Sequence, residues 1–304
     1  MARPAGKSSG KYVIKGTRGD DIIDGRTYDL ALQERGLSID GSAGNDILRG
    51  GSGQDYLNGN HGNDTLIADE SDLSGVASGT LIYQGGSGVD TLDLSAIPFA
   101  EGTGLWIRSG GGTTWIATDF DTAGGITDLN WSWGERWIDS FAGIENFRLG
   151  DGDDNVQLIT GAGSNTVWAG AGDDFVEAGD GNDVLFGEDG NDVLSHGWGD
   201  DVMTGGLGND AFLLAGRVVG QYTFDRITDF DTKSGEADTQ YDAIWLYNGW
   251  TLTWDASSTD VLRGHFYDPA YGEVFGEIIL EGLTYADSAL VPILSYDPMT
   301  GIAT

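Results

Sequence analysis

The stretch Ala169–Leu213 decides the fold, and it reads AGAGDDFVE AGDGNDVLF GEDGNDVLS HGWGDDVMT GGLGNDAFL. These are five nine-residue units without a gap, and in each unit position 4 is Gly, position 6 is Asp and position 8 is apolar. The position-6 residues are Asp174, Asp183, Asp192, Asp201 and Asp210, and the position-8 residues are Val176, Leu185, Leu194, Met203 and Phe212. A fixed period of this kind indicates a repeat architecture.

The residue types of one unit predict a tight turn followed by a short strand. Closely spaced glycines permit a positive φ, and Asn or Asp at position 5 tolerates such a turn next best. Positions 7–9 then form a three-residue strand in which position 8 points inward. Two units make one coil of about eighteen residues, and coils stack as parallel strands about 4.8 Å apart. A glycine-rich loop or a disordered segment would not keep an apolar residue at every position 8.

The stacked coils bring carboxylates together, and this predicts a bound cation. Two carboxylates about 4.8 Å apart repel each other by about 1 kcal/mol even in water. The core is thin, because only one side chain in nine points inward. Carboxylates and turn carbonyls are oxygen ligands of the kind that Ca²⁺ prefers. We therefore predict a fold that forms as several calcium ions bind.

The units resemble the RTX (repeats-in-toxin) nonapeptide, GGxGxDx-apolar-x, of the hemolysin-type calcium-binding β-roll family that type I systems secrete. The resemblance implies that one ion is shared by two units eighteen residues apart. The first unit would supply the carbonyls of positions 2 and 4 and its Asp, and the second unit the carbonyls of positions 1 and 3 and its Asp. Residues other than Gly at these positions, His61 and His196 among them, would act through their carbonyls.

Carried onto this sequence, the resemblance implies four such sites. Their ligands would be Gly170, Gly172 and Asp174 with Gly187, Asp189 and Asp192; Gly179, Gly181 and Asp183 with His196, Trp198 and Asp201; Glu188, Gly190 and Asp192 with Gly205, Leu207 and Asp210; and Ser42, Gly44 and Asp46 with Gly59, His61 and Asp64. Less regular units add Asp21, Asp55, Asp90 and Asp154 as candidate ligands. In TGAGSNTVW, Asn165 replaces Asp, which removes a charge.

The fold class we predict is all-β, with two parallel β-roll segments (RTX nonapeptide solenoids), a Trp-rich β section between them and a C-terminal β cap. The predicted division is a tail over 1–15, a first RTX β-roll with insertions over 16–95, a Trp-rich section over 96–148, a second RTX β-roll over 149–213, and over 214–304 the cap with a secretion-signal region. A short helix is expected over Leu30–Arg35. The two rolls either stack into one solenoid or form separate domains.

Two segments outside the regular repeats carry candidate functions. The Trp-rich section has alternating runs, LWIRS and TWIAT, that predict strands, and its aromatic residues form either a β core or a face that stacks on sugars. Asp119–Gly125 within it is a candidate cation loop. In the cap, Asp229 and Asp231 form either a calcium site, together with Glu236, Asp238 and Asp242, or an acidic solvated loop.

Composition excludes several classes of protein. With 49 acidic and 15 basic residues the net charge is -34, which argues against nucleic acid or an anionic membrane as partner and favours cations. Without Cys there is no disulfide, thiolate metal site or Cys nucleophile. No run reaches the length of a membrane span, and the N-terminus lacks the apolar h-region of an ordinary secretory signal peptide. The family resemblance implies instead an uncleaved type I export signal near the C-terminus.

The sequence leaves three functions open. The motifs HExxH and GxSxG are absent, which removes the zinc-protease and lipase sites that accompany some RTX rolls, and we expect a protein that is not an enzyme. Our first hypothesis is a secreted, extracellular calcium-binding protein with a structural, adhesive or cell-surface role. The second is a calcium-dependent polysaccharide-binding module, and the third is an enzyme that acts on polysaccharide.

Overall fold

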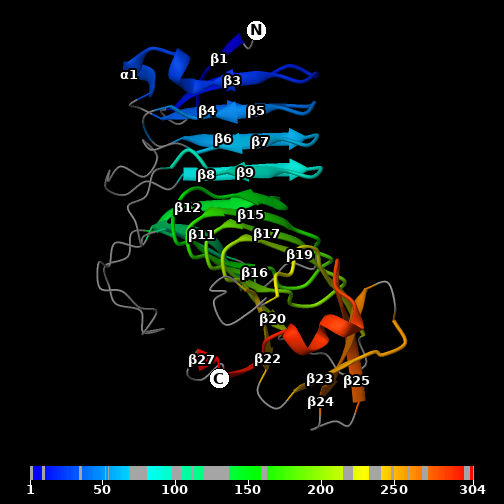
Figure 1. Ribbon diagram of the computed structural model, residues 1–304. Helices are drawn as coiled ribbons and strands as arrows, with labels where there is room; N and C mark the ends of the chain where they lie inside the picture. The colour runs from blue at the N-terminus through cyan, green and yellow to red at the C-terminus, as the bar shows by residue number, and fades with distance from the viewer. Residues whose placement is uncertain are drawn as a thin grey trace. The chain divides into compact units, whose positions relative to one another are not determined.

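The computed structural model is built almost entirely of strands, and the chain divides into two compact units, Met1–Gly152 and Asp153–Thr304. The residues that it describes are 3–8, 11–33, 36–51, 53, 55–68, 81–97, 104–110, 113–118, 137–158, 163–214, 222–232, 241–247, 250–258, 261–268, 273–297 and 302–303. Figure 1 shows the strands of each unit running side by side in successive rungs.

The repeats of the Asp153–Thr304 unit form two parallel stacks of strands. The first stack is β14 (Asn155–Leu158), β16 (Phe175–Glu177), β18 (Val193–Ser195) and β20 (Ala211–Leu214). The second is β15 (Thr166–Ala171), β17 (Val184–Asp189) and β19 (Val202–Leu207). Phe175 pairs with Val193 and Val184 with Val202, so residues eighteen apart lie on neighbouring rungs. The predicted parallel β-roll, with two repeats to a coil, is confirmed.

The core of this unit is the column of position-8 side chains. All five, from Val176 to Phe212, are fully buried, while the flanking side chains of β16 and β17 are half-buried. The strands of the second stack are six residues long rather than the predicted three. They continue into positions 1–3 of the next repeat, where hydrogen bonds between coils also extend: the Gly172 N–H donates to the Asp189 carbonyl at 2.8 Å.

The glycine at position 4 is required by close contact between coils. Gly199 has a φ of +132°, and a Cβ there would collide with the carbonyl oxygen of Gly181 in the coil before it. We expect Gly199→Ala to lower the free energy of unfolding by about 1–3 kcal/mol, through backbone strain and the separation of two coils. Gly163 is the control at the same repeat position, because a Cβ there meets nothing within 4 Å. Thermal unfolding in calcium buffer tests this, and equal melting temperatures for Gly199→Ala and Gly163→Ala would contradict it.

The Met1–Gly152 unit contains a similar pair of parallel stacks. One holds β2 (Lys11–Lys15), β4 (Leu37–Asp40), β6 (Tyr56–His61) and β8 (Leu81–Ser87). The other holds β3 (Ile22–Asp24), β5 (Ile47–Arg49), β7 (Thr65–Ile67), β9 (Thr91–Asp93) and β13 (Asn146–Arg148). A turn of helix, η1 (Gly25–Thr27), and the helix α1 (Leu30–Gln33) interrupt the repeats where a short helix is predicted.

The first fifteen residues, which the sequence predicts to be a tail, are part of the first roll. They contain β1 (Arg3–Ser8), which pairs antiparallel with β2, and β2 in turn pairs parallel with β4. The reason is Ile14, which is fully buried and continues the apolar column of the roll by one rung.

The Trp-rich section is a hairpin inserted beside the first roll. Its strands β10 (Leu105–Gly110) and β11 (Thr113–Thr118) pair antiparallel and contain the runs LWIRS and TWIAT, as predicted. β12 (Trp137–Ala142) joins β11 antiparallel and β8 parallel. The candidate cation loop Asp119–Gly125 lies outside the described residues, as do Trp131 and Trp133. The role of the tryptophans therefore stays a prediction.

The C-terminal cap continues both stacks of the second unit. β21 (Thr223–Ile227) pairs with β19, and β22 (Ala243–Tyr247) pairs with β20. β25 (Glu273–Leu280), β24 (Leu262–Asp268) and β23 (Thr251–Trp254) add a sheet edge beyond β21, and β26 (Ile293–Asp297) and β27 (Ile302–Ala303) add one beyond β22.

The segment EIILEGLTYADS, Glu277–Ser288, is a strand only as far as Leu280. The helix η2 (Tyr285–Leu290) follows, because the Asp287 side chain accepts the Thr284 N–H at 2.8 Å and starts a helical turn. Among the described residues, no helix combines the length and apolar character needed to cross a bilayer.

Candidate metal-binding site

The position-6 aspartates of the Asp153–Thr304 unit are joined into two ladders by hydrogen bonds between coils. In each ladder, the backbone N–H of one residue donates to Oδ1 of the aspartate in the next coil. The first aspartate ladder is Asp154, Asp174, Asp192, Asp210 and Asp242, with N–O distances of 2.7, 2.9, 2.9 and 3.0 Å. The second aspartate ladder is Asn165, Asp183, Asp201 and Asp225, with distances of 2.7, 2.8 and 3.3 Å.

The Met1–Gly152 unit holds a third aspartate ladder of the same construction. Its members are Asp21, Asp46, Asp64, Asp90 and Glu145, with distances of 2.8, 2.8, 2.7 and 2.9 Å. The last member is a glutamate from the loop before β13, fifty-five residues beyond Asp90. The carboxylate stack therefore ends on a side chain from outside the nonapeptide pattern.

The second oxygen of most ladder aspartates has no partner. In the described part of the chain, Oδ2 is buried and accepts no hydrogen bond in eight ladder residues. They are Asp46, Asp64, Asp90, Asp174, Asp183, Asp192, Asp201 and Asp210. Because a buried, unsatisfied carboxylate oxygen is costly by several kcal/mol, a row of them requires protons or cations to complete it.

Backbone carbonyls of the turns face the same gaps between coils. A Cβ on Gly197 or Gly199 would collide with the carbonyl oxygens of Gly179 and Gly181, which are positions 2 and 4 of the coil before. The same relation holds for Gly206 and Gly208 with the carbonyls of Glu188 and Gly190, and for Gly62 with that of Gly44. Carbonyl oxygens thus line the space that the missing side chains leave open.

The position-3 carbonyls border the gaps as well. Those of Asp189, Trp198 and Leu207 accept the position-4 N–H of the earlier coil at 2.8, 2.7 and 2.8 Å, and that of His61 does so at 3.0 Å. A carbonyl oxygen has two lone pairs, so one remains for a further partner. Position 1 lies beside the free carboxylate oxygen: a Cβ on Gly187, Gly205 or Gly59 would collide with Oδ2 of the Asp in its own unit.

The donor set fits calcium. It consists of anionic carboxylate oxygens and neutral carbonyl oxygens around one gap, which is the oxygen-only, high-coordination environment that Ca²⁺ takes. The family model for the RTX calcium-binding nonapeptide repeat (4 copies) matches residues 13–27, 38–72, 141–176, 150–185, 159–194 and 177–212. These segments of the chain carry RTX calcium-binding nonapeptide repeats. The repeats support a calcium-binding β-roll protein, and the matched residues contain all members of the three ladders except Asp90, Asp225 and Asp242.

Solved structures also resemble this RTX chain. The solution structure of the AlgE6R3 subunit from the Azotobacter vinelandii mannuronan C5-epimerase is 25% identical, with a TM-score of 0.28, and covers 46% of this chain and 78% of its own. The crystal structure of the extracellular lipase LipA from Serratia marcescens is 19% identical, with a TM-score of 0.24, and covers 84% of this chain. This chain spans 40% of that lipase. No curated protein sequence matches the chain.

Burial controls the electrostatics of the RTX ladders. Desolvation raises the pKa of Asp174 to about 9, of Asp201 to about 8 and of Asp192 to about 7, against a usual value of 3.8. Neighbouring ladder carboxylates add to the rise, and the backbone N–H on Oδ1 opposes it. The pKa of Asp183 and Asp210 rises to about 6 for the same first cause. A cation among these groups reverses the direction, because it stabilises the charged carboxylate.

Four predicted ligands are not among the residues with a buried Oδ2 that accepts no hydrogen bond. Both oxygens of Asp229 accept backbone N–H groups, from Gly205 and Gly206 at 2.9 Å each, and the side chain is exposed. Oδ2 of Asp55 accepts the Gly51 N–H at 2.6 Å. Oδ2 of Asp21 accepts the Thr17 N–H. The exposed Asp231 donates its backbone N–H to Oδ2 of Asp242 at 2.7 Å. Of the other cap candidates, Glu236 and Asp238 lie outside the described residues.

Sequence reasoning missed the residues that end the ladders. Asp225 was not a candidate, Asp242 was considered only for a loop site, and Glu145 was not considered. A signal exists for the two aspartates: FDRI and YDAI keep the order of Asp at position 6 and an apolar residue at position 8, although the glycine at position 4 is missing. The His196 side chain was also missed, because its repeat position suggests a role for the carbonyl alone.

Proposed function

We propose that this protein is a secreted calcium-binding protein whose RTX rolls fold as several Ca²⁺ ions bind between stacked turns. The observation that carries the proposal is the row of buried Oδ2 atoms without a hydrogen-bond partner along the ladders. Each belongs to a carboxylate whose other oxygen is held by the neighbouring coil. A cation bound at Oδ2 would therefore join two coils that otherwise repel each other.

The ligand sets we propose follow the family pattern. For the middle of the first aspartate ladder they are the carbonyls of Gly170 and Gly172 with Asp174, and the carbonyls of Gly187 and Asp189 with Asp192. Asp192 would also serve the next ion along the ladder, with Glu188, Gly190, Gly205, Leu207 and Asp210. On the second aspartate ladder they are Gly179, Gly181 and Asp183 with His196, Trp198 and Asp201. Among these, the carbonyls of Gly172, Gly179, Gly181, Glu188 and Gly190 face the next coil, which supports the sets.

The biological role we propose is structural or adhesive, outside the cell. Calcium is scarce inside cells and plentiful outside, so a chain that needs it to fold would stay unfolded until export. The net charge of -34 suits a protein that is held together by bound cations. A glycan array in calcium buffer separates this role from the polysaccharide-binding alternative, for which binding to a defined glycan is the expected result.

Anomalous scattering tests the proposed sites directly. Crystals grown in calcium are expected to show anomalous peaks beside Oδ2 of Asp174, Asp192, Asp183 and Asp201. The signal is easy to assign, because the chain has no Cys and only three Met. Peaks at these positions that vanish after exchange into magnesium would support calcium selectivity. Maps with water alone at every ladder position would overturn the proposal.

A further inference from the structure

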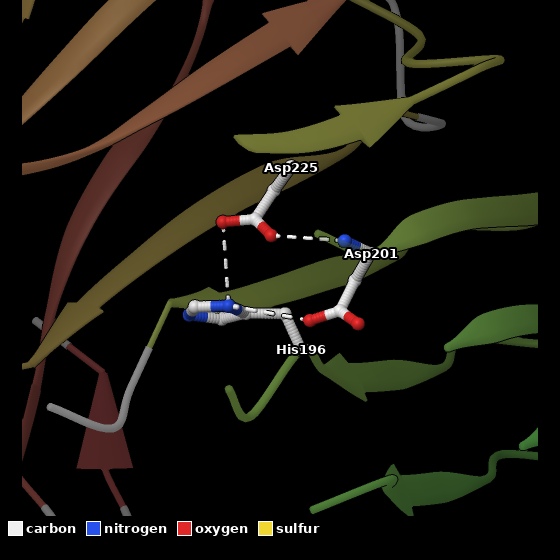
Figure 2. A group of neighbouring side chains, drawn as sticks. All are labelled: His196, Asp201 and Asp225. Carbon is white, nitrogen blue, oxygen red and sulfur yellow. Dashed lines mark hydrogen bonds and ion pairs between the residues drawn. The ribbon is translucent and has the colours of Figure 1, made fainter. Parts of the chain in front are cut away.

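One coil of the second roll departs from the pattern at position 1. His196 stands there, where the neighbouring units have Gly187 and Gly205. Its side chain is not directed to solvent, as only 2% of the residue is exposed. It lies at the end of the second aspartate ladder, between Asp201 of its own unit and Asp225 of the cap strand β21 (Figure 2).

These three side chains converge on a small space. Nδ1 of His196 lies 3.3 Å from Oδ2 of Asp225 and 3.7 Å from Oδ2 of Asp201, and one ligand atom from each residue lies within 4.8 Å of the others. Neither ring nitrogen of His196 makes a hydrogen bond in the described structure, nor does Oδ2 of Asp201. Two carboxylates and an imidazole therefore meet in the interior with unused donor atoms.

The two aspartates are held in place by other groups. Oδ1 of Asp201 accepts the Asp183 N–H at 2.8 Å, and Oδ1 of Asp225 accepts the Asp201 N–H at 3.3 Å. The Thr223 hydroxyl also donates to Oδ2 of Asp225 at 3.2 Å. Outer hydrogen bonds of this kind fix the direction of metal-binding side chains. The backbone ladder thus orients both carboxylates toward the imidazole.

We propose that His196, Asp201 and Asp225 form a site for one divalent transition-metal ion, zinc above all, at the end of the second aspartate ladder, where it shares Asp201 with the last proposed calcium site. Imidazole nitrogen beside carboxylate oxygen suits Zn²⁺, whereas Ca²⁺ prefers oxygen alone. Ligands 2.0–2.1 Å from a tetrahedral Zn²⁺ lie about 3.4 Å apart, close to the separations of 3.3 and 3.7 Å found here. A water molecule completes the fourth position.

The position of the site gives it a structural role. Along the regular ladder, aspartates are eighteen residues apart, but Asp225 follows Asp201 by twenty-four. The metal ion joins the last regular coil to β21 at the point where the repeat is broken. There the ring of His196 lies beside Oδ2 of Asp201, at a repeat position where the neighbouring units have Gly187 and Gly205 and therefore no side chain. The zinc site therefore closes the roll.

Zinc binding to the full chain in saturating calcium tests the proposal. Equilibrium dialysis followed by metal analysis is expected to find one zinc per chain. His196→Gly, which restores the usual residue of position 1, is expected to bind zinc at least about a hundredfold more weakly, since even an outer-shell change costs 10–100-fold. The proposed calcium ligand at position 196 is the backbone carbonyl, which this variant retains, and bound calcium is measured in the same samples. The matched control is His61→Ala, which removes an exposed histidine at position 3 and should retain the zinc.

Histidine side-chain NMR on the unmodified protein makes the test independent of how the variants fold. With three His in the chain, zinc is expected to shift the Nδ1 signal of His196 and to leave His61 and His265 unchanged. Zinc retained equally by His196→Gly, or no zinc in excess over calcium, or an unshifted His196 signal would each overturn the proposal. Because these readouts are made with calcium bound, a failure here leaves the calcium sites standing.

Discussion

Asp192→Ala is expected to remove about two calcium ions and to weaken the calcium-dependent folding of the whole second roll. Asp192 lies in the middle of the first aspartate ladder, where its Oδ1 accepts the Asp174 N–H and its own N–H donates to Asp210, each at 2.9 Å. Its Oδ2 is buried and without a partner. In the proposed ligand sets it serves the ion on either side, so one substitution damages two sites.

The expected magnitude follows from the loss of a buried ionic partner, which costs about 3–5 kcal/mol. Since 1.4 kcal/mol is a factor of ten, the equilibrium constant of calcium-dependent folding should fall by about two to four orders of magnitude, and the calcium concentration at the folding midpoint should rise. Calcium titration followed by calorimetry measures both the midpoint and the number of ions.

Asp189→Ala is the matched control for this prediction. It removes the same charge three residues away, from an exposed side chain at position 3 whose carbonyl alone is a proposed ligand. Its calcium midpoint and stoichiometry should stay close to those of the unmodified protein. If the two variants behave alike, net charge rather than a bound ion at Oδ2 would explain the effect.

The stability of the protein is expected to depend on pH in opposite directions with and without calcium. Without calcium, burial raises the pKa of Asp174 to about 9, of Asp201 to about 8 and of Asp192 to about 7. A carboxyl whose pKa is raised in the folded state binds more protons there than in the unfolded chain. Its stabilising contribution is therefore complete below about pH 4 and is lost as the pH rises toward 9.

Calcium is expected to reverse this dependence, because it binds the deprotonated carboxylates and displaces their protons. The far-UV β signal of the metal-free protein, small at neutral pH, should fall from pH 5 to pH 8, while the melting temperature of the calcium-loaded protein should rise over the same range. Calcium added to weakly buffered protein near pH 7 should release protons. A stability that changes with pH in the same direction in both states, with no proton release, would refute the exchange of protons for calcium.

The period of the repeats predicts the roll, because local chemistry and stacking agree there. Val176 and Leu185 are buried and Asp174 and Asp183 lie on ladders, as the spacing indicates. The long strands of the second stack were not predicted, since positions 1–3 are too rich in glycine to be recognised as strand. They are extended because the neighbouring coil offers them hydrogen bonds, and a single repeat does not reveal this.

The ends of the ladders depend on contacts between segments far apart in sequence. Asp225, Asp242 and Glu145 join their ladders after gaps of twenty-four, thirty-two and fifty-five residues, so no fixed period identifies them. The repeat period does not predict the burial of the His196 side chain either. Its side chain is buried because β21 brings Asp225 next to it, and that pairing follows an irregular loop length.

The most direct test of the account is a calcium titration of the metal-free protein followed by far-UV circular dichroism, with magnesium as the control ion. The account predicts a chain with little β signal that gains it cooperatively as calcium is added, and that stays unchanged in equal magnesium. The opposite result, a full β spectrum without divalent ions that calcium up to the millimolar range leaves unaltered, would contradict the claim that calcium holds the stacked turns together.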